Sequence, residues 1–182
     1  LEIKKSIEKD VEWSLSQEDP NPDNAHRYVY SSKSIEVETA KNPISREKVV
    51  MVDAINHALN EEMDLNPKMI IYGQDIADPK GGVFTATKGL SSKYGKDRVF
   101  NSPLAESSII GTAIGLAVTG YKPVVEIQFA DYIWTSMMQI RNEVVTMRYR
   151  SNNLWECPLI IRAPVGGYIN GGIYHSQSID CL

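Results

Sequence analysis

One carboxylic acid, Glu106, precedes a segment that is almost free of charge. Residues 107–119 alternate small residues, among them Gly111 and Gly115, with isoleucine, leucine and valine. A helix with so many small residues is expected to pack very closely against another element, since glycine otherwise destabilises a helix. Apolar surroundings favour the neutral form of Glu106, whereas a helix N-terminus favours the carboxylate. The sequence does not decide between these two effects. A protonated or proton-sharing Glu106 would suit hydrogen bonding to a nitrogen base, and a purely structural role is equally open.

Four further side chains follow apolar runs that have the character of strands. Gln74 and Asp75 follow the first run, Tyr132 follows the third, and His175 lies in a glycine-rich loop after the fourth. In a parallel sheet the loops after the strands share one edge, where ligands bind, so we expect these side chains to converge with Glu106. Structural interpretations stay open: Asp75 as a turn cap, Tyr132 as packing, and His175 as a donor to a backbone carbonyl.

These side chains depend on an alternation of strand-like and helix-like segments. Short apolar runs predict strands at residues 68–72, 98–101, 122–128 and 159–162. Helical patterns predict a helix from Ser45 onward and others at 85–94, 107–119 and 133–150. The first of these helices is expected to bury Val50, Met51, Ala54, Ile55, Ala58 and Leu59. This order predicts an α/β fold, a parallel sheet with helices on both faces.

The chain before Ser45 has a different character. Residues 1–17 predict a charged amphipathic helix, which the prolines of EDPNPDN end, and residues 27–41 have the pattern of a linker. We therefore expect a boundary near Ile44, with an N-terminal tail at 1–44 and the sheet domain at 45–182. The chain begins at Leu1 rather than Met and ends just after a loop, so we expect a piece of a longer protein with an incomplete domain.

Composition argues against several classes of function. Among 182 residues the net charge is −4, which leaves no general excess of basic groups to neutralise nucleic-acid phosphates. No apolar run reaches the roughly 18 residues of a membrane span. The two cysteines, Cys157 and Cys181, have no CxxC spacing and favour a reducing compartment, the cytoplasm or, in a eukaryote, the mitochondrial matrix.

Motifs for phosphate or metal binding are missing from the sequence. There is no GxxxxGK[ST], no GxGxxG after a strand, and no HExxH or Cys/His cluster. A ligand-binding edge that carries an acid but no phosphate loop predicts a half-site. A partner would then hold the rest of the ligand.

Several separated motifs occur in a family's order and spacing: IIYGQDIADPKGGVF, SPLAESSIIGTAIGLAVTG, EIQFADY and YHSQS. Together they resemble the β subunit of thiamine-diphosphate-dependent 2-oxo acid dehydrogenases, the decarboxylating first components of branched-chain and pyruvate dehydrogenase complexes. The resemblance covers residues 45–178 and corresponds to the pyrimidine-binding, transketolase-like domain of that subunit. The segment EDPNPDNAHRYVYS resembles the C-terminal tail of the α subunit, which implies a fused α–β chain.

The resemblance implies oxidative decarboxylation of a branched-chain 2-oxo acid or pyruvate, followed by reductive acylation of a lipoyl group. Glu106 matches the glutamate that hydrogen-bonds N1′ of the cofactor's aminopyrimidine, and Tyr132 matches the aromatic residue packed on that ring. His175 matches a histidine near the substrate. The pyrimidine pocket would be lined by Leu104 together with Gln74 or Asp75.

In the same family an α-type domain binds the diphosphate and Mg²⁺ through a GDG…NN motif. Asn152 and Asn153 lack the upstream GDG, so the resemblance implies that the α-type domain or subunit supplies this half and that the fragment alone is inactive. Leu159 lies where the family uses a backbone carbonyl to bind structural K⁺. The other implied partners are a lipoyl-bearing acyltransferase and further copies of the chain.

Two alternatives remain from the sequence. A transketolase or deoxyxylulose-phosphate-synthase type of enzyme shares the pyrimidine domain and the glutamate, although EIQFADY and YHSQS favour the dehydrogenase branch. A non-catalytic domain would instead use its glycine-rich helix for subunit packing.

Overall fold

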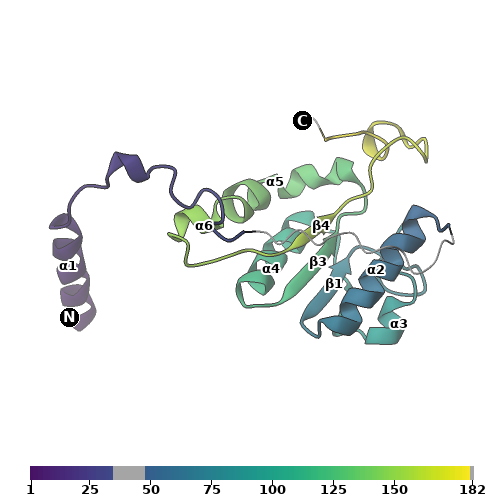
Figure 1. Ribbon diagram of the computed structural model, residues 1–182, viewed down its shortest axis with the longest axis horizontal. Helices are drawn as coiled ribbons and strands as arrows, with labels where there is room; N and C mark the ends of the chain where they lie inside the picture. The colour runs from purple at the N-terminus through teal and green to yellow at the C-terminus, as the bar shows by residue number, and fades with distance from the viewer. Residues whose placement is uncertain (35–47, 181–182) are drawn as a thin grey trace.

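The computed structural model describes residues 1–34 and 48–180 (Figure 1). The sheet consists of β1 (Met69–Gly73), β2 (Val99–Asn101), β3 (Lys122–Glu126) and β4 (Ile160–Arg162). These four strands lie in the order β2-β1-β3-β4, and every neighbouring pair is parallel. In the register, Ile71 lies opposite Val99 on one side and Val124 on the other. The predicted strands and the parallel α/β fold are confirmed.

Helices cover both faces of this sheet, as predicted (Figure 1). One face is covered by α2 (Met51–Leu65) and α3 (Leu90–Tyr94), and the other by α4 (Glu106–Val118). Neighbouring residues of β1 point to opposite faces: Ile71 belongs to a core with Met63 of α2, whereas Tyr72 belongs to a core with Ile110 of α4. The two cores hold the strand ends, and the loops after them, in fixed positions.

The buried face of α2 differs from the prediction. Met63 is buried, and Leu59, Ile55 and Val52 are half-buried about one, two and three turns before it. Val50, Met51, Ala54 and Ala58, which were expected in the core, are exposed. Polar Asn56 lies on the inner face instead. Its Nδ2 donates to the carbonyl oxygens of Ala86 at 2.9 Å and Lys88 at 3.1 Å. The helix expected from Ser45 onward begins at Met51, and Ser45 itself lies outside the described residues.

The single long helix expected at 133–150 is wrong. The structure has a 3-10 helix η2 (Ala130–Ser136), α5 (Met137–Gln139), a π-helical turn η3 (Ile140–Val144) and α6 (Met147–Arg150). The Val145 N–H donates to the Ile140 carbonyl at 3.0 Å, one residue beyond the α-helical spacing. The Thr146 hydroxyl also donates to the Asn142 carbonyl. Such bonds from threonine compete with regular helix geometry in this β-branched stretch.

Only some of the small residues of α4 pack closely within the described part of the chain: Ala113 and Ala117 do, and the glycines do not. The buried residues of this helix are Ile109, Ile110, Ala113 and Ala117. Gly111, Thr112 and Gly115 lie on its exposed face. A Cβ placed on Gly115 would meet no described atom within 4 Å, and one on Gly111 would meet only Gln139 Cγ at 3.9 Å.

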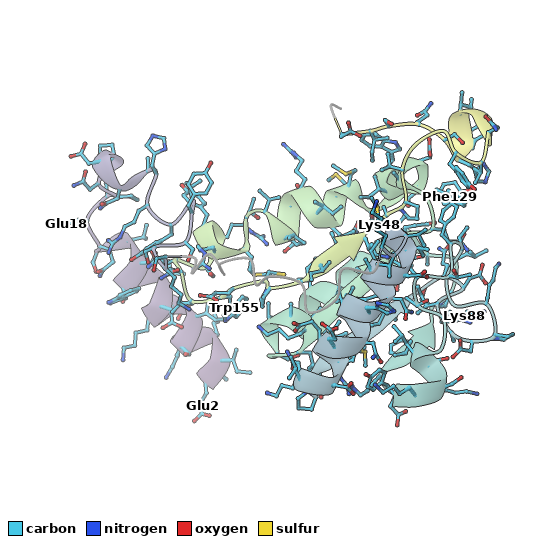
Figure 2. All side chains as sticks on the ribbon, turned by 45° about the vertical axis from the view of Figure 1, so that its right-hand side comes forward. Glu2, Glu18, Lys48, Lys88, Phe129 and Trp155 are labelled. Carbon is cyan, nitrogen blue, oxygen red and sulfur yellow. The ribbon has the colours of Figure 1, made fainter. Side chains whose placement is uncertain are left out.

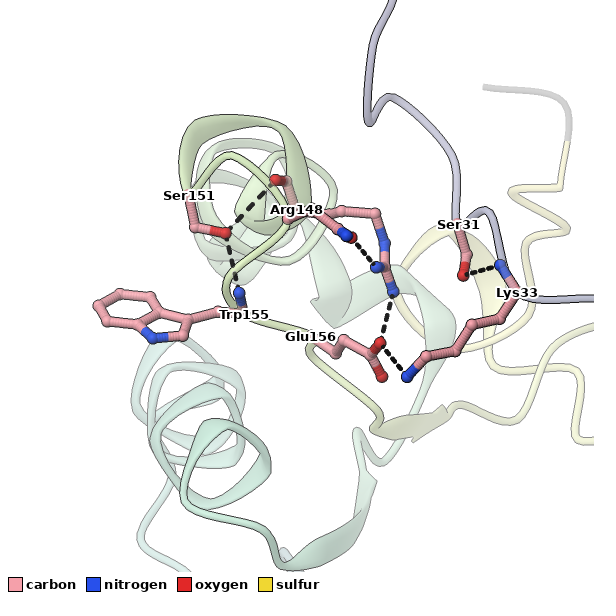
Figure 3. A network of polar contacts seen from close by, with 7 residues as sticks. Ser31, Lys33, Arg148, Ser151, Trp155 and Glu156 are labelled. Carbon is pink, nitrogen blue, oxygen red and sulfur yellow. Dashed lines mark hydrogen bonds and ion pairs between the residues drawn. The ribbon is translucent and has the colours of Figure 1, made fainter.

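The N-terminal tail forms the predicted helix, α1 (Glu2–Leu15), away from the sheet (Figure 1). None of its residues is buried. After the short η1 (Pro22–Asn24) the chain reaches the end of α6, where Lys33 Nζ lies 2.7 Å from Glu156 Oε1 (Figure 3). Arg148 approaches the same oxygen at 3.4 Å. The expected boundary near Ile44 lies outside the described residues, so the domain division stays a prediction.

In the part of the chain that the structure describes, no helix has the length and apolar character needed to cross a membrane.

Candidate functional site

Glu106 and Gln74 meet at the edge formed by the carboxyl ends of the strands. Glu106 is the first residue of α4, and Gln74 directly follows β1. Gln74 is only 2% exposed, and its Nε2 donates to Glu106 Oε1 at 3.1 Å. Gln74 Oε1 is buried without a hydrogen-bond partner among the described residues. Two predicted site residues are therefore in contact, next to an acceptor that has no partner.

Thr135 is a site residue that the sequence did not indicate. Its Oγ1 lies 3.3 Å from Glu106 Oε2 and 3.1 Å from the Tyr132 carbonyl oxygen. Thr135 lies in the segment predicted as one long helix, and a single threonine in a helical pattern does not indicate a functional site. The 3-10 winding of η2 brings this hydroxyl to the start of α4.

An aromatic cluster joins the loop after β3 to the loop after β4. Tyr132 Oη lies 2.7 Å from His175 Nε2. The Phe129 ring lies edge-on to His175, with centroids 4.8 Å apart, and to Tyr132, at 5.6 Å. Figure 2 shows Phe129 beside the C-terminal loop, which contains the short helix η4 (Gly172–Tyr174). Tyr132 and His175 are thus brought together, and Thr135 links the Tyr132 backbone to Glu106.

Asp75 and Leu104 lie differently from Gln74. Asp75 Oδ2 accepts hydrogen bonds from Lys80 Nζ at 2.6 Å and from Gln128 Nε2 at 2.7 Å. Its carboxylate thus contacts two side chains of neighbouring loops rather than Glu106, and its place in the pyrimidine pocket stays a prediction. Leu104 lies just before α4 with 82% of its surface exposed, and the described residues do not enclose it.

A buried ion pair lies at the same end of the sheet. Glu126, the last residue of β3, is 2% exposed and pairs through Oε2 with the Arg162 guanidinium on β4. Burial raises the pKa of Glu126 above its usual range, although Arg162 opposes that change. Glu126 Oε1 has no hydrogen-bond partner among the described residues. The sequence did hold a sign of this pair, because Glu126 interrupts an apolar strand.

Asp78 organises the loop that follows Gln74. Its carboxylate accepts hydrogen bonds from the Gly89 N–H at 2.7 Å, from Ser91 Oγ at 2.8 Å and from Ser92 Oγ at 2.7 Å. Desolvation opposes the ionisation of Asp78, but these bonds outweigh it and lower the pKa to about 2. The loop between β1 and α3 is therefore fixed around one anionic side chain.

Leu159 lies at the opposite end of the sheet from Glu106. It is half-buried just before β4 and lines an apolar groove of about 350 Å³ with Met69 and Val124. Nothing in the described residues bears on the expected potassium contact of its carbonyl. No group of three or more His, Cys, Asp or Glu side chains in residues 1–34 and 48–180 could hold a metal ion. Burial raises the pKa of the half-buried Cys157 thiol, and Cys181 lies outside the described residues.

Comparison with known proteins identifies the sheet region. Residues 47–179 match the family described as the transketolase pyrimidine-binding domain. The chain is 48% identical over 131 residues to the 2-oxoisovalerate dehydrogenase subunit beta of Bacillus subtilis (strain 168), covering 72% of this chain and 40% of that protein. It is 46% identical over 146 residues to the mitochondrial 2-oxoisovalerate dehydrogenase subunit beta of Dictyostelium discoideum, covering 80% and 38%.

A relative with a different substrate in its name is also similar. The pyruvate dehydrogenase E1 component subunit beta of Bacillus subtilis (strain 168) is 40% identical over 135 residues, which cover 74% of this chain and 41% of that protein. The chain thus spans about two fifths of the length of the curated relatives that it matches.

Proposed function

This chain belongs to the transketolase pyrimidine-binding domain family, and on that premise we propose that it supplies the aminopyrimidine half of a thiamine-diphosphate site. The whole protein would be the decarboxylating component of a 2-oxo acid dehydrogenase. The observation that carries this proposal is the Glu106 carboxyl group, which starts α4 at the ligand-binding edge. Among the described residues its donors are the neutral side chains of Gln74 and Thr135.

The residues around Glu106 fit an aminopyrimidine. Such a ring offers a basic nitrogen, for which Glu106 is the matching acid, and an amino group, which needs an acceptor. Gln74 Oε1 is a buried acceptor without a partner in the described residues. Tyr132 offers an aromatic face close by, held by its bond to His175. The acid of Glu106 and the acceptor of Gln74 therefore match the nitrogen and the amino group of the ring.

Thiamine diphosphate, when bound, supplies the electron sink that decarboxylation of a 2-oxo acid requires. Glu106 would hold a proton at the ring nitrogen, as a positioned general acid–base group does. Gln74 would orient the carboxyl group by its donation to Oε1. The bond from Tyr132 to His175 Nε2 would hold that imidazole in place near a substrate.

The other half of the site and the partners follow from the same proposal. An α-type domain or subunit would hold the diphosphate and Mg²⁺, and this chain alone would then be inactive. A lipoyl-bearing acyltransferase would accept the acyl group, and the Leu159 carbonyl would bind K⁺. The 2-oxo acid would be branched-chain or pyruvate, since the names of the relatives include both 2-oxoisovalerate and pyruvate.

The exposed face of α4 supports a second role, in subunit packing. Gly111, Thr112 and Gly115 lie there with almost no described atom against them, and such small side chains allow the close approach of another helix. We therefore expect copies of the protein to associate through this face. A clean monomer in light scattering would contradict this role.

Glu106→Gln in the fully assembled enzyme tests the proposal. We expect decarboxylation to fall by about 100-fold or more, because the amide cannot share a proton as the acid does. Glu61→Gln, at an exposed position on α2, is the matched control and should leave activity unchanged. Full activity of Glu106→Gln would overturn the catalytic role, and loss of assembly would support the packing role instead. Transfer to a sugar phosphate rather than a lipoyl group would favour the transketolase-type alternative.

A further inference from the structure

Two side-chain bonds join η2 to the first turn of α4 at one residue, Thr135. The Ser107 hydroxyl donates to the Thr135 carbonyl oxygen. The Thr135 hydroxyl lies 3.3 Å from Glu106 Oε2. Thr135 is therefore bound through both its backbone and its side chain to two consecutive residues of α4. We call this pair of bonds the Thr135 clamp.

The clamp acts on a torsion that is otherwise poorly fixed. The last torsion of a glutamate side chain has broad preferences, so one hydrogen bond leaves the carboxyl plane free to turn. Gln74 binds Oε1 from the end of β1, and Thr135 binds Oε2 from η2. Donors from two different elements, one on each oxygen, fix the plane of the carboxyl group.

The Thr135 hydroxyl also suits both protonation states of Glu106. A hydroxyl has one proton and rotates freely, and Oγ1 lies 3.1 Å from the Tyr132 carbonyl as well. When Glu106 Oε2 is anionic, it is the stronger acceptor and takes the bond. When Glu106 instead shares a proton with its partner nitrogen, Oε2 is a weaker acceptor, and the Thr135 proton can turn to the Tyr132 carbonyl oxygen. No proton leaves Thr135 in either arrangement.

We propose that Thr135 is a positioning residue, which orients the Glu106 carboxyl group for its partner nitrogen. This inference rests on the proposed function of Glu106. Thr135 would act on the reaction through Glu106 rather than on the 2-oxo acid, so its loss should slow turnover without weakening the binding of the 2-oxo acid.

The test compares Thr135→Val, Thr135→Ser and a control in the assembled holoenzyme. Thr135→Val keeps the shape but removes the hydroxyl, and we expect kcat to fall about tenfold with KM for the 2-oxo acid within about twofold. Thr135→Ser keeps the hydroxyl and should restore kcat. The control is Thr119→Val at the far end of α4, where the hydroxyl donates to the Gly115 and Leu116 carbonyls of its own helix.

Glu106→Gln, measured beside these variants, separates two kinds of failure. If Glu106→Gln is inactive while Thr135→Val turns over like the wild type, the positioning role is overturned and the proposed function stands. If Glu106→Gln is active, the proposed function itself fails. A Thr135→Val variant that lowers kcat without rescue by serine would also overturn the inference.

Ser107→Ala covers the case in which Thr135→Val does not fold. It releases only the backbone bond of the clamp, and we expect kcat to fall about threefold with KM unchanged. A wild-type kcat for Ser107→Ala would then contradict the clamp.

Discussion

Removing Arg162 should destabilise the protein by leaving Glu126 buried without its counter-ion. Glu126 is 2% exposed, and Arg162 is its only ion-pair partner in the described chain. Breaking one half of a buried pair costs about 3 to 5 kcal/mol. The loss cannot exceed the free energy of protonating Glu126, because the buried carboxyl group can bind a proton instead of staying charged. At pH 7 this free energy is about 4 kcal/mol, from 1.36 kcal/mol for each pH unit above the ordinary pKa of about 4.3. We therefore expect Arg162→Met to lose about 3 kcal/mol of unfolding free energy.

The pH dependence of that loss has a definite sign. Burial raises the pKa of Glu126 in the folded protein, and loss of Arg162 raises it further. Between the unfolded and folded pKa values the folded state binds more protons, so stability falls as the pH rises through this window. The deficit of Arg162→Met should be largest near pH 7. It should shrink as the pH falls to about 4 and below, where the carboxyl group is mostly neutral in both states.

Urea unfolding at a series of pH values measures this deficit. Arg150→Met is the matched control: it breaks the pair of Arg150 with Glu143, whose side chains are 53% and 44% exposed, and should cost less than about 1 kcal/mol. A second substitution, Glu126→Gln in the Arg162→Met background, should recover most of the loss at pH 7. A deficit that is equal at pH 4 and pH 7 would refute the reasoning.

Three further predictions test the tail and the loops around the site. Asp78→Asn should lower the stability of the folded protein above about pH 4. The wild type loses this same stability as the pH falls toward about 2, the pKa of Asp78 in the folded protein. An acid-unfolding curve by circular dichroism that is the same for both proteins would contradict this. Lys33→Ala should lower the unfolding free energy, measured in urea, by less than about 1 kcal/mol, because the side chains of Lys33 and Glu156 are 75% and 42% exposed. A larger loss would show that the tail is firmly bound. Gly73→Ala should cost about 3 kcal/mol in the same assay, since a Cβ there would overlap the Glu126 carbonyl; a cost below about 1 kcal/mol would be inconsistent with that contact.

The sequence predicted the sheet because its strands are apolar on both faces. Each of β1 to β4 lies within or one residue from its predicted range, and the polar residues after them meet at one edge. Glu106 was singled out by contrast with its apolar neighbours. Glu106 contacts Gln74 because β1, which precedes Gln74, pairs in parallel with β2, which precedes α4.

Other features depend on tertiary packing that periodicity does not report. The 3-10 and π turns between Ala130 and Val144 were missed, because apolar spacing in a helix tolerates an added or lost residue. Thr135 was missed for the same reason. On α2 the inner face includes Asn56, so a prediction from apolar residues alone chose the wrong stripe. The glycine-rich face of α4 was expected to be covered, and in the described chain it is exposed.

Binding of thiamine diphosphate with Mg²⁺, measured by calorimetry, tests the proposed half-site most directly. The titration would be made into this chain alone and into the chain assembled with its α-type partner. We expect tight binding only by the assembly, because Glu106 and its neighbours would hold the aminopyrimidine while the partner holds the diphosphate. Equally tight binding by this chain alone would contradict the half-site, and no binding by the assembly would remove the cofactor from its function.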